Sequence, residues 1–316
     1  MNPIRALLII TIIASTGAAA ELKYAIVPNF FQVKTNQPMG PCHGGAVIDK
    51  AGLIYVTTDT PRGIDVFTAG GKYMRSIGPT EIHGLELREE NGVEYFYAAR
   101  PNQHEVVKLS LDGTKLWALQ YPSESGLYKD EKTFKPCAVT VAPDGSLFVA
   151  DGYGANYVLR FDPQRKFVKA FGGPGKEEGK FNTCHGIALD TRQGKPLLLV
   201  CNRNNDRVEH WDLDGKFVGV IQKDLRMPAA VHIRGDYALI PELKGRVTVL
   251  NKDGSIAAQL GDNPKEKQRA NFGLPQDQWT DGICNSPHGG SIDRDGNLII
   301  TEWSKFGHLH KFALVK

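Results

Sequence analysis

Three histidines with the same local context recur along the chain at nearly equal spacing. His83, His185 and His288 are each followed by glycine, and the intervals between them are 102 and 103 residues. Imidazole is a common zinc ligand, and three histidines with an open fourth position are typical of a catalytic zinc site. A metal held this way activates a bound water or a substrate oxygen. The sequence therefore predicts a zinc site at His83, His185 and His288, whereas capping of strands or filling of a channel is the alternative role.

A tyrosine and an arginine lie in polar clusters that follow two apolar runs. Tyr153 belongs to the sequence Asp-Gly-Tyr-Gly, and Arg203 follows Asn202. A nearby metal and guanidinium group favour a phenolate, which suits Tyr153 to act as a base. Arg203 carries a planar fork of N–H donors that matches a substrate carboxylate. The sequence predicts Tyr153 and Arg203 as catalytic residues, with packing in a turn as the alternative role.

The stretch from Thr183 to Arg203 predicts the element that positions these groups. Two short apolar runs flank a turn around Gly194, a pattern typical of a β-hairpin. Antiparallel pairing places the start of the first strand beside the end of the second. His185 and Arg203 are therefore expected at the same end of the hairpin.

This hairpin recurs in six units along the chain. The second strands are predicted at Leu53–Thr57, Tyr95–Ala99, Leu147–Asp151, Leu197–Asn202, Tyr237–Pro241 and Leu298–Glu302. Third strands are predicted at Ile64–Phe67, Val106–Leu109, Tyr157–Phe161, Val208–Trp211, Val247–Leu250 and Leu309–Phe312. Five units continue through a turn into a fourth strand, whereas the sixth has none and the run Lys23–Val33 has no neighbour.

Four-stranded units that repeat every ~40–50 residues predict an all-β, six-bladed β-propeller. The N-terminal strand at Lys23–Val33 is expected to supply the last strand of the sixth blade, which closes the ring and covers its edges. The first strand of each blade lines the central channel. Because the three histidines fall in units two, four and six, related by rotations of about 120°, they are expected to converge at the channel mouth.

The odd-numbered units carry other residues at the histidine position. Unit three has Cys137 and unit five has Ala229. Unit one reads Pro-Cys-His-Gly-Gly around His43, but aligning Asp49 with Asp293 shifts His43 by one residue. We therefore expect His43 to flank the site and do not count it as a ligand. Cys137 is expected to be a small buried residue.

The composition and the first twenty residues limit the classes of protein to which the chain can belong. The net charge is only +3, which predicts no nucleic-acid partner, and the 34 glycines and 18 prolines favour an all-β chain with many turns. Residues 1–20 resemble a signal peptide, with Arg5, a short apolar run and small residues up to Ala20. The apolar run is too short to span a bilayer. We expect cleavage near Ala20, a propeller over residues 21–316 without a membrane span, and a secreted or periplasmic protein.

Five cysteines occur, and an oxidising compartment would allow some of them to pair. An odd number leaves at least one thiol free. Cys184 and Cys201 lie at the two ends of the hairpin described above, so a disulfide between them is a hypothesis.

The residues resemble a known family. The repeats look like NHL repeats, and the ordered set of His83, Tyr153, His185, Arg203 and His288 resembles the lyase domain of peptidylglycine α-amidating monooxygenase. The resemblance extends over nearly the whole chain after residue 20. It implies a six-bladed propeller that cleaves peptidyl-α-hydroxyglycine to a peptide amide and glyoxylate, with zinc held by three histidines. It also implies that Tyr153 takes the proton of the substrate hydroxyl, that Arg203 orients Tyr153 or the substrate, and that a structural calcium is present.

The sequence departs from this family at several positions. The family has an arginine in its first blade, where this chain has Gly44, and neither Arg62 nor Arg100 falls on that position. Gly154 and Asn202 replace a cysteine and an aspartate of the family. The lyase is expected to act on an α-hydroxyglycine-type substrate that a separate hydroxylating enzyme supplies.

Two other functions are compatible with the sequence. The first is a non-catalytic NHL-repeat propeller that binds a protein or a small ligand on its loop face. The second is a calcium-dependent lactonase-like propeller, which is disfavoured because that type requires carboxylates where this chain has histidine, cysteine and alanine.

Overall fold

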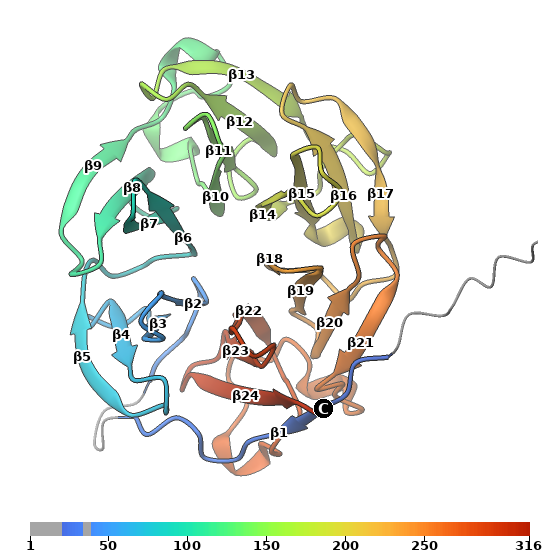
Figure 1. Ribbon diagram of the computed structural model, residues 1–316. Coiled ribbons are helices and arrows are strands. Elements are labelled where there is room, and N and C mark those ends of the chain that lie inside the picture. Colours follow the sequence, from blue (N-terminus) through green and yellow to red (C-terminus); the bar gives the residue numbers. More distant parts are fainter. Residues whose placement is uncertain (1–20, 34–38) are drawn as a thin grey trace, which may run out of the picture.

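A computed structural model describes residues 21–33 and 39–316, which form six four-stranded antiparallel sheets arranged in a ring (Figure 1). The predicted all-β, six-bladed propeller is therefore confirmed. Single turns of 3-10 helix are found at Ser123–Ser125, Glu131–Thr133, Arg203–Asn205, Glu266–Gln268 and Gln276–Gln278. Within the described ranges, no helix has the length and apolar character needed to cross a membrane. The predicted signal peptide, residues 1–20, lies outside the described residues.

Each of the first five blades consists of consecutive strands. Blade 1 has β2 (Ala46–Ile48), β3 (Ile54–Thr57), β4 (Ile64–Phe67) and β5 (Tyr73–Ile77). Blade 2 has β6 (Gly84–Glu90), β7 (Val93–Arg100), β8 (Glu105–Ser110) and β9 (Lys115–Leu119). Blade 3 has β10 (Ala138–Val141), β11 (Leu147–Ala150), β12 (Tyr157–Phe161) and β13 (Phe167–Gly172). Blade 4 has β14 (Cys184–Asp190), β15 (Leu197–Asn202), β16 (Arg207–Asp212) and β17 (Phe217–Gln222). Blade 5 has β18 (His232–Arg234), β19 (Tyr237–Glu242), β20 (Arg246–Leu250) and β21 (Ile256–Leu260).

The sixth blade joins the two ends of the described chain. It combines β22 (Pro287–Ile292), β23 (Leu298–Glu302) and β24 (His308–Leu314) with β1 (Tyr24–Ile26), which pairs antiparallel with β24. Ring closure by an N-terminal strand is thus confirmed, but the strand is shorter than the predicted run. Pro28 has no N–H to donate and Asn29 adopts a positive φ of 54°, so the chain leaves the sheet there. It reaches blade 1, where Gln32 bridges to Lys72.

The hydrophobic core lies between neighbouring blades. One cluster joins Phe148 and Val158 of blade 3 to Leu198 and Trp211 of blade 4. Inner strands such as β11 are buried at every position, because another blade covers each face, whereas the outer strand β5 has exposed residues. The stacked blades therefore hold the inner strands rigidly around the channel.

Candidate metal centre

The three predicted histidines lie at equivalent positions in the inner strands. His83 immediately precedes β6, whereas His185 and His288 lie near the starts of β14 and β22. In β14 and β22 the strand register shifts next to the histidine. Such bulges redirect a side chain out of the regular alternation of a strand. All three side chains are buried, between 1% and 6% exposed.

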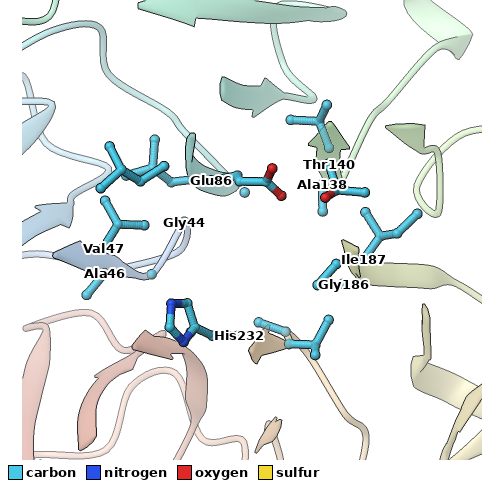
Figure 2. A pocket seen from close by; sticks show the side chains of 18 of the residues that line it. Gly44, Ala46, Val47, Glu86, Ala138, Thr140, Gly186, Ile187 and His232 are labelled. Carbon is cyan, nitrogen blue, oxygen red and sulfur yellow. The ribbon is translucent and has the colours of Figure 1, made fainter. Parts of the chain in front are cut away.

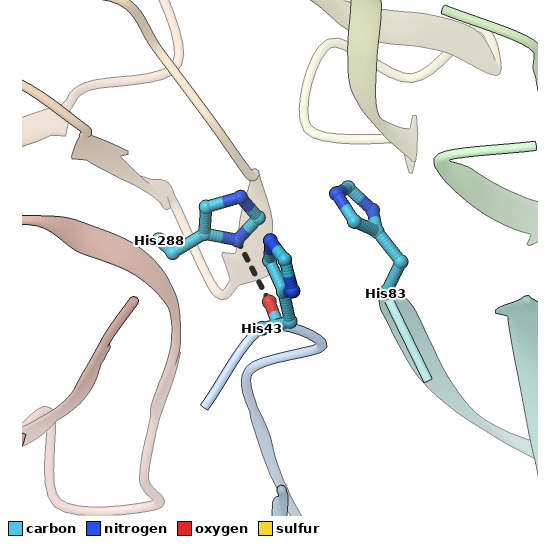
Figure 3. A group of neighbouring side chains, drawn as sticks. All are labelled: His43, His83 and His288. Carbon is cyan, nitrogen blue, oxygen red and sulfur yellow. Dashed lines mark hydrogen bonds between the residues drawn. The ribbon is translucent and has the colours of Figure 1, made fainter. Parts of the chain in front are cut away.

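Even-numbered blades supply the imidazoles, and odd-numbered blades supply the carbonyl groups that orient them. His83 Nδ1 lies 2.8 Å from the carbonyl oxygen of Cys137, and His185 Nδ1 lies 2.5 Å from that of Ala229. His288 Nδ1 donates in the same way to the carbonyl of His43, at 2.7 Å (Figure 3). Because a carbonyl oxygen only accepts, each Nδ1 carries the proton and each Nε2 keeps a free lone pair. This tautomer is the one that ligates a metal through Nε2.

The three rings form a nearly equilateral triangle. Their centroids are 4.6 Å apart for His83 and His185, 4.9 Å for His185 and His288, and 5.1 Å for His83 and His288. Burial holds the pKa of each imidazole well below its usual value, and neighbouring histidines and Arg203 act in the same direction. The rings are therefore neutral at physiological pH. The structure thus brings together three neutral imidazoles, side chains of a kind that can bind a metal ion.

The glycine after each histidine allows the neighbouring blade to approach. A Cβ on Gly84 would lie 2.4 Å from the carbonyl oxygen of Cys137, the same atom that orients His83. A Cβ on Gly186 would lie 2.7 Å from Ala230, and one on Gly289 would lie 2.4 Å from the Cα of Gly45. The His-Gly pair is thus a packing requirement of the site.

Tyr153 and Arg203 lie directly beside the imidazoles. The Tyr153 hydroxyl is 3.1 Å from Nε2 of His83 and 3.0 Å from Nε2 of His185, and Arg203 donates to it at 2.9 Å. Tyr153 is 38% exposed, but its hydroxyl contacts the buried imidazoles. Burial raises the pKa of Tyr153 to about 12, and the cation of Arg203 acts against this rise. The tyrosine oxygen therefore faces the Nε2 atoms of His83 and His185.

His43 lies beside the three imidazoles, at the flanking position expected from the sequence. Its ring stacks on Trp303 and lies 4.8 Å from His83 and 4.7 Å from His288, centroid to centroid (Figure 3). Its Nδ1 is 2.9 Å from a carboxylate oxygen of Asp59. Possible ligand atoms of His43, His83 and His288 lie within 4.8 Å of one another, as do those of His83, Cys137 and His185. The sequence signal that relates His43 to the other histidines is the glycine that follows it.

Two cavities adjoin the histidines. One, of about 500 Å³, runs down the channel from the imidazoles, and Glu86 and His232 reach into it (Figure 2). The other, of about 280 Å³, is lined by His43, His83 and Tyr153 together with Lys135 and Asp59. The centre is therefore open on two sides.

The two arginines considered as substitutes for the family's first-blade arginine, and Asn202, have other partners. Arg62 bonds to Asp65 and Arg100 forms an ion pair with Glu105, and neither lines these cavities. Asn202 donates to Glu209 at 3.0 Å, a bond that an aspartate at this position could not make. The side-chain amide of Asn202 therefore suits the neighbouring Glu209 carboxylate, because it can donate a hydrogen bond.

The hypothesis of a Cys184–Cys201 disulfide is wrong. All five cysteines are free and buried. Cys184 lies opposite Asn202 in the β14–β15 pair, so Cys201 points to the other face of the sheet. The two thiols accordingly belong to different core clusters.

Comparison with known proteins yields distant relatives. The chain is 22% identical over 266 residues to a probable peptidyl-α-hydroxyglycine α-amidating lyase of Caenorhabditis elegans, covering 81% of this chain and 64% of that protein. It is 28% identical over 184 residues to peptidylglycine α-amidating monooxygenase of Rattus norvegicus, covering 54% of this chain and 18% of the rat protein. The match thus spans less than two thirds of either relative. No protein-family model matches the chain.

Solved structures share the fold. A streptogramin B lyase superposes with a TM-score of 0.61 at 14% identity, covering 93% of this chain and 98% of that one. A gluconolactonase-like protein superposes with a TM-score of 0.60 at 14% identity, covering 93% and 97%. These likenesses concern the fold alone. Together with the sequence matches they confirm the expected resemblance: the chain is a six-bladed β-propeller that is homologous, at low identity, to the peptidyl-α-hydroxyglycine α-amidating lyases.

Proposed function

We propose that this protein is a zinc-dependent lyase that cleaves the C–N bond of an α-hydroxyglycine-type substrate and releases an amide and glyoxylate. One observation carries the proposal. The rings of three neutral imidazoles lie within 5.1 Å of one another, centroid to centroid, and the Tyr153 hydroxyl, itself bonded to Arg203, lies within 3.1 Å of Nε2 of His83 and His185. The distant homology to amidating lyases supports the same kind of reaction.

The donor set fits zinc. Three histidine nitrogens with a fourth side open to cavities match the ligands of catalytic zinc sites, and each Nδ1 is anchored as such ligands require. Zinc bound there would act as a Lewis acid on a substrate oxygen.

Tyr153 is proposed as the base. It takes the proton of the substrate hydroxyl, so that the carbon–oxygen bond becomes a carbonyl while the C–N electron pair leaves with the amide nitrogen. That nitrogen takes up a proton, and the products are the amide and glyoxylate. Arg203 donates to the tyrosine oxygen, which stabilises its anionic form.

The smaller cavity is proposed as the place of the substrate. It adjoins Tyr153 and is lined by Lys135, whose positive charge would attract the carboxylate of a hydroxyglycine end against the acidic residues Asp59 and Glu81 of the same cavity. A separate hydroxylating enzyme is proposed to supply this substrate. Export through the N-terminal segment is part of the same proposal.

Glyoxylate release tests the proposal. Purified protein loaded with zinc should release glyoxylate from an N-acyl-α-hydroxyglycine, and His185→Asn should abolish the release. His104→Asn is the matched control, because His104 lies outside the centre and bonds only to the carbonyl of Phe134. A protein that binds zinc through the three histidines but releases no glyoxylate would instead be a non-catalytic propeller, and the proposal would fail.

A further inference from the structure

A second group of metal-ligand side chains lies inside blade 6, away from both cavities. Possible ligand atoms of Cys284, Glu302 and His310 lie within 4.8 Å of one another. Cys284 and Glu302 are 0% exposed and His310 is 3% exposed. None of the three lines the cavities beside the central histidines. The group is therefore distinct from the proposed catalytic centre.

Among the described residues, no arginine or lysine forms an ion pair with the buried Glu302. Its carboxylate accepts from the backbone N–H groups of Asn285 and Ser286 and lies 2.7 Å from His310 Nε2. His308 adds a second imidazole, with Nδ1 3.6 Å from the carboxylate. A buried carboxylate needs a positive partner, because its transfer from water is costly. In blade 6 the available side chains are imidazoles and a thiol.

Blade 5 shows the usual solution at the same strand positions. Glu242 corresponds to Glu302, and Arg246, which pairs with it across the strands, corresponds to His308. Arg246 bonds Glu242 through two nitrogens, at 2.8 and 2.7 Å. Blade 4 also has an arginine at this position, Arg207, which pairs with Asn202 across the strands and bonds Glu209 of its own strand. Blade 6 thus has a histidine where blades 4 and 5 have an arginine, and it adds a cysteine.

The surroundings of Glu302 also contain polar atoms without partners. Asn285 Nδ2, Ser286 Oγ, Ser304 Oγ and His308 Nδ1 are buried and form no hydrogen bond to the described residues. Native proteins rarely leave such atoms unsatisfied, and an ion with its waters is a common reason. Gly261 leaves room for the thiol, since a Cβ there would lie 2.6 Å from Cys284 Sγ.

We propose that Cys284, Glu302 and His310, with His308 as the fourth donor, bind a structural zinc-type ion in blade 6. Sulfur, nitrogen and oxygen donors in a closed tetrahedral arrangement are typical of zinc. A thiolate and a carboxylate balance the two positive charges of the ion, so the buried complex is neutral. The ion neutralises the charge of Glu302, as Arg246 neutralises that of Glu242.

Cobalt substitution tests this site. Full-length protein refolded with Co²⁺ should show thiolate-to-cobalt charge-transfer absorption, which histidine ligands alone do not produce. Cys284→Ser should abolish this absorption and remove one ion per chain, and Glu302→Gln should lower the metal content in the same way. Cys137→Ser, which removes the thiol beside His83 and His185, is the matched control and should keep the absorption.

The outcomes separate this site from the central one. Wild-type protein with both sites loaded contains two ions per chain. One ion per chain together with a thiolate band that requires Cys284 still supports the blade 6 site and counts against the central one. Wild-type protein without any thiolate band, or a band that requires Cys137 and survives Cys284→Ser, overturns the inference.

Discussion

The central histidines and the blade 6 cluster use the same side chain in opposite settings. The central rings come from three blades, donate their Nδ1 protons to backbone carbonyls and face cavities. In blade 6, His308 and His310 lie on one strand and surround a buried carboxylate. A metal ion bound to the central histidines would keep a coordination position open to an exchangeable ligand, as catalytic zinc does. A metal ion enclosed by the blade 6 side chains would have no open position, as in structural zinc sites.

Removing a central histidine should have the largest effect. His185→Asn should take both the central ion and the lyase activity below detection, because a lost Lewis acid removes several kcal/mol of transition-state stabilisation. Metal analysis and glyoxylate release measure the two losses. The blade 6 ion should stay bound, and its loss in this variant would show that the two regions are coupled.

Tyr153→Phe should separate catalysis from metal binding at the centre. The phenyl ring keeps the packing against His83 and His185 but removes the hydroxyl that Arg203 contacts. We expect the turnover number to fall by about 10²–10⁴, the usual contribution of a general base, with unchanged zinc content. Unchanged turnover would remove Tyr153 from the mechanism.

His310→Leu should test the structural role of the blade 6 cluster. It leaves the buried Glu302 without its nearest imidazole, which is expected to cost about 3–5 kcal/mol of the free energy of unfolding. Thr248→Val in blade 5 is the matched control, since Arg246 still neutralises Glu242 there and the loss should be about 1 kcal/mol. Equal losses in urea unfolding would contradict the contrast between the blades.

Gly84→Ala should weaken the central metal without touching a ligand. The new Cβ pushes against the Cys137 carbonyl that orients His83, and loss of such an orienting bond typically lowers metal affinity by about 10–100-fold. Gly219→Ala is a control because nothing lies within 4 Å of its added Cβ. Competition with a chelator measures the affinity, and an unchanged value would show that the carbonyl is dispensable.

The pKa values of two buried carboxyl groups at strand ends are shifted in opposite directions. Burial raises the pKa of Asp151 to about 6. Burial acts in the same direction on Glu302, but its hydrogen bond with His310 and the histidine charges leave its pKa below the usual value. A raised carboxyl pKa gives stability that is present below the unfolded pKa and is lost as pH rises through 6.

Asp151→Asn should therefore gain stability relative to wild type between pH 4 and pH 8, by about 2 kcal/mol. Urea unfolding at both pH values measures the difference. A constant difference across this range would show that Asp151 remains ionised throughout.

Much of the fold could be predicted because its signals are local. The second strand of blade 4 and the third strand of blade 1 have the predicted bounds, Leu197–Asn202 and Ile64–Phe67. Short apolar runs and turn residues specify a strand within a few neighbours of the chain. The strand at Lys23–Val33 was predicted too long, because it ends at Ile26, and Pro28 and the positive φ of Asn29 turn the chain out of the sheet.

The sequence could predict that the three histidines lie together, but not which groups they contact. The spacing of His83, His185 and His288 identifies three related positions, and the repeat explains why they meet. Packing between blades decides the contacts of His43, the carbonyl partner of each ring and the burial of Cys184 away from Cys201. Packing between blades joins residues far apart in the chain, which no local pattern encodes.

The sequence by itself determined the strands, the number of blades and which histidines share a position, because turn chemistry and strand periodicity act within a few residues. Only the tertiary structure decided which nitrogen of each imidazole is free, where Tyr153 places its oxygen, and that Glu302 meets Cys284 and His310. Protonation and ligand geometry depend on neighbours from other blades or loops, and these neighbours come together only when the ring closes.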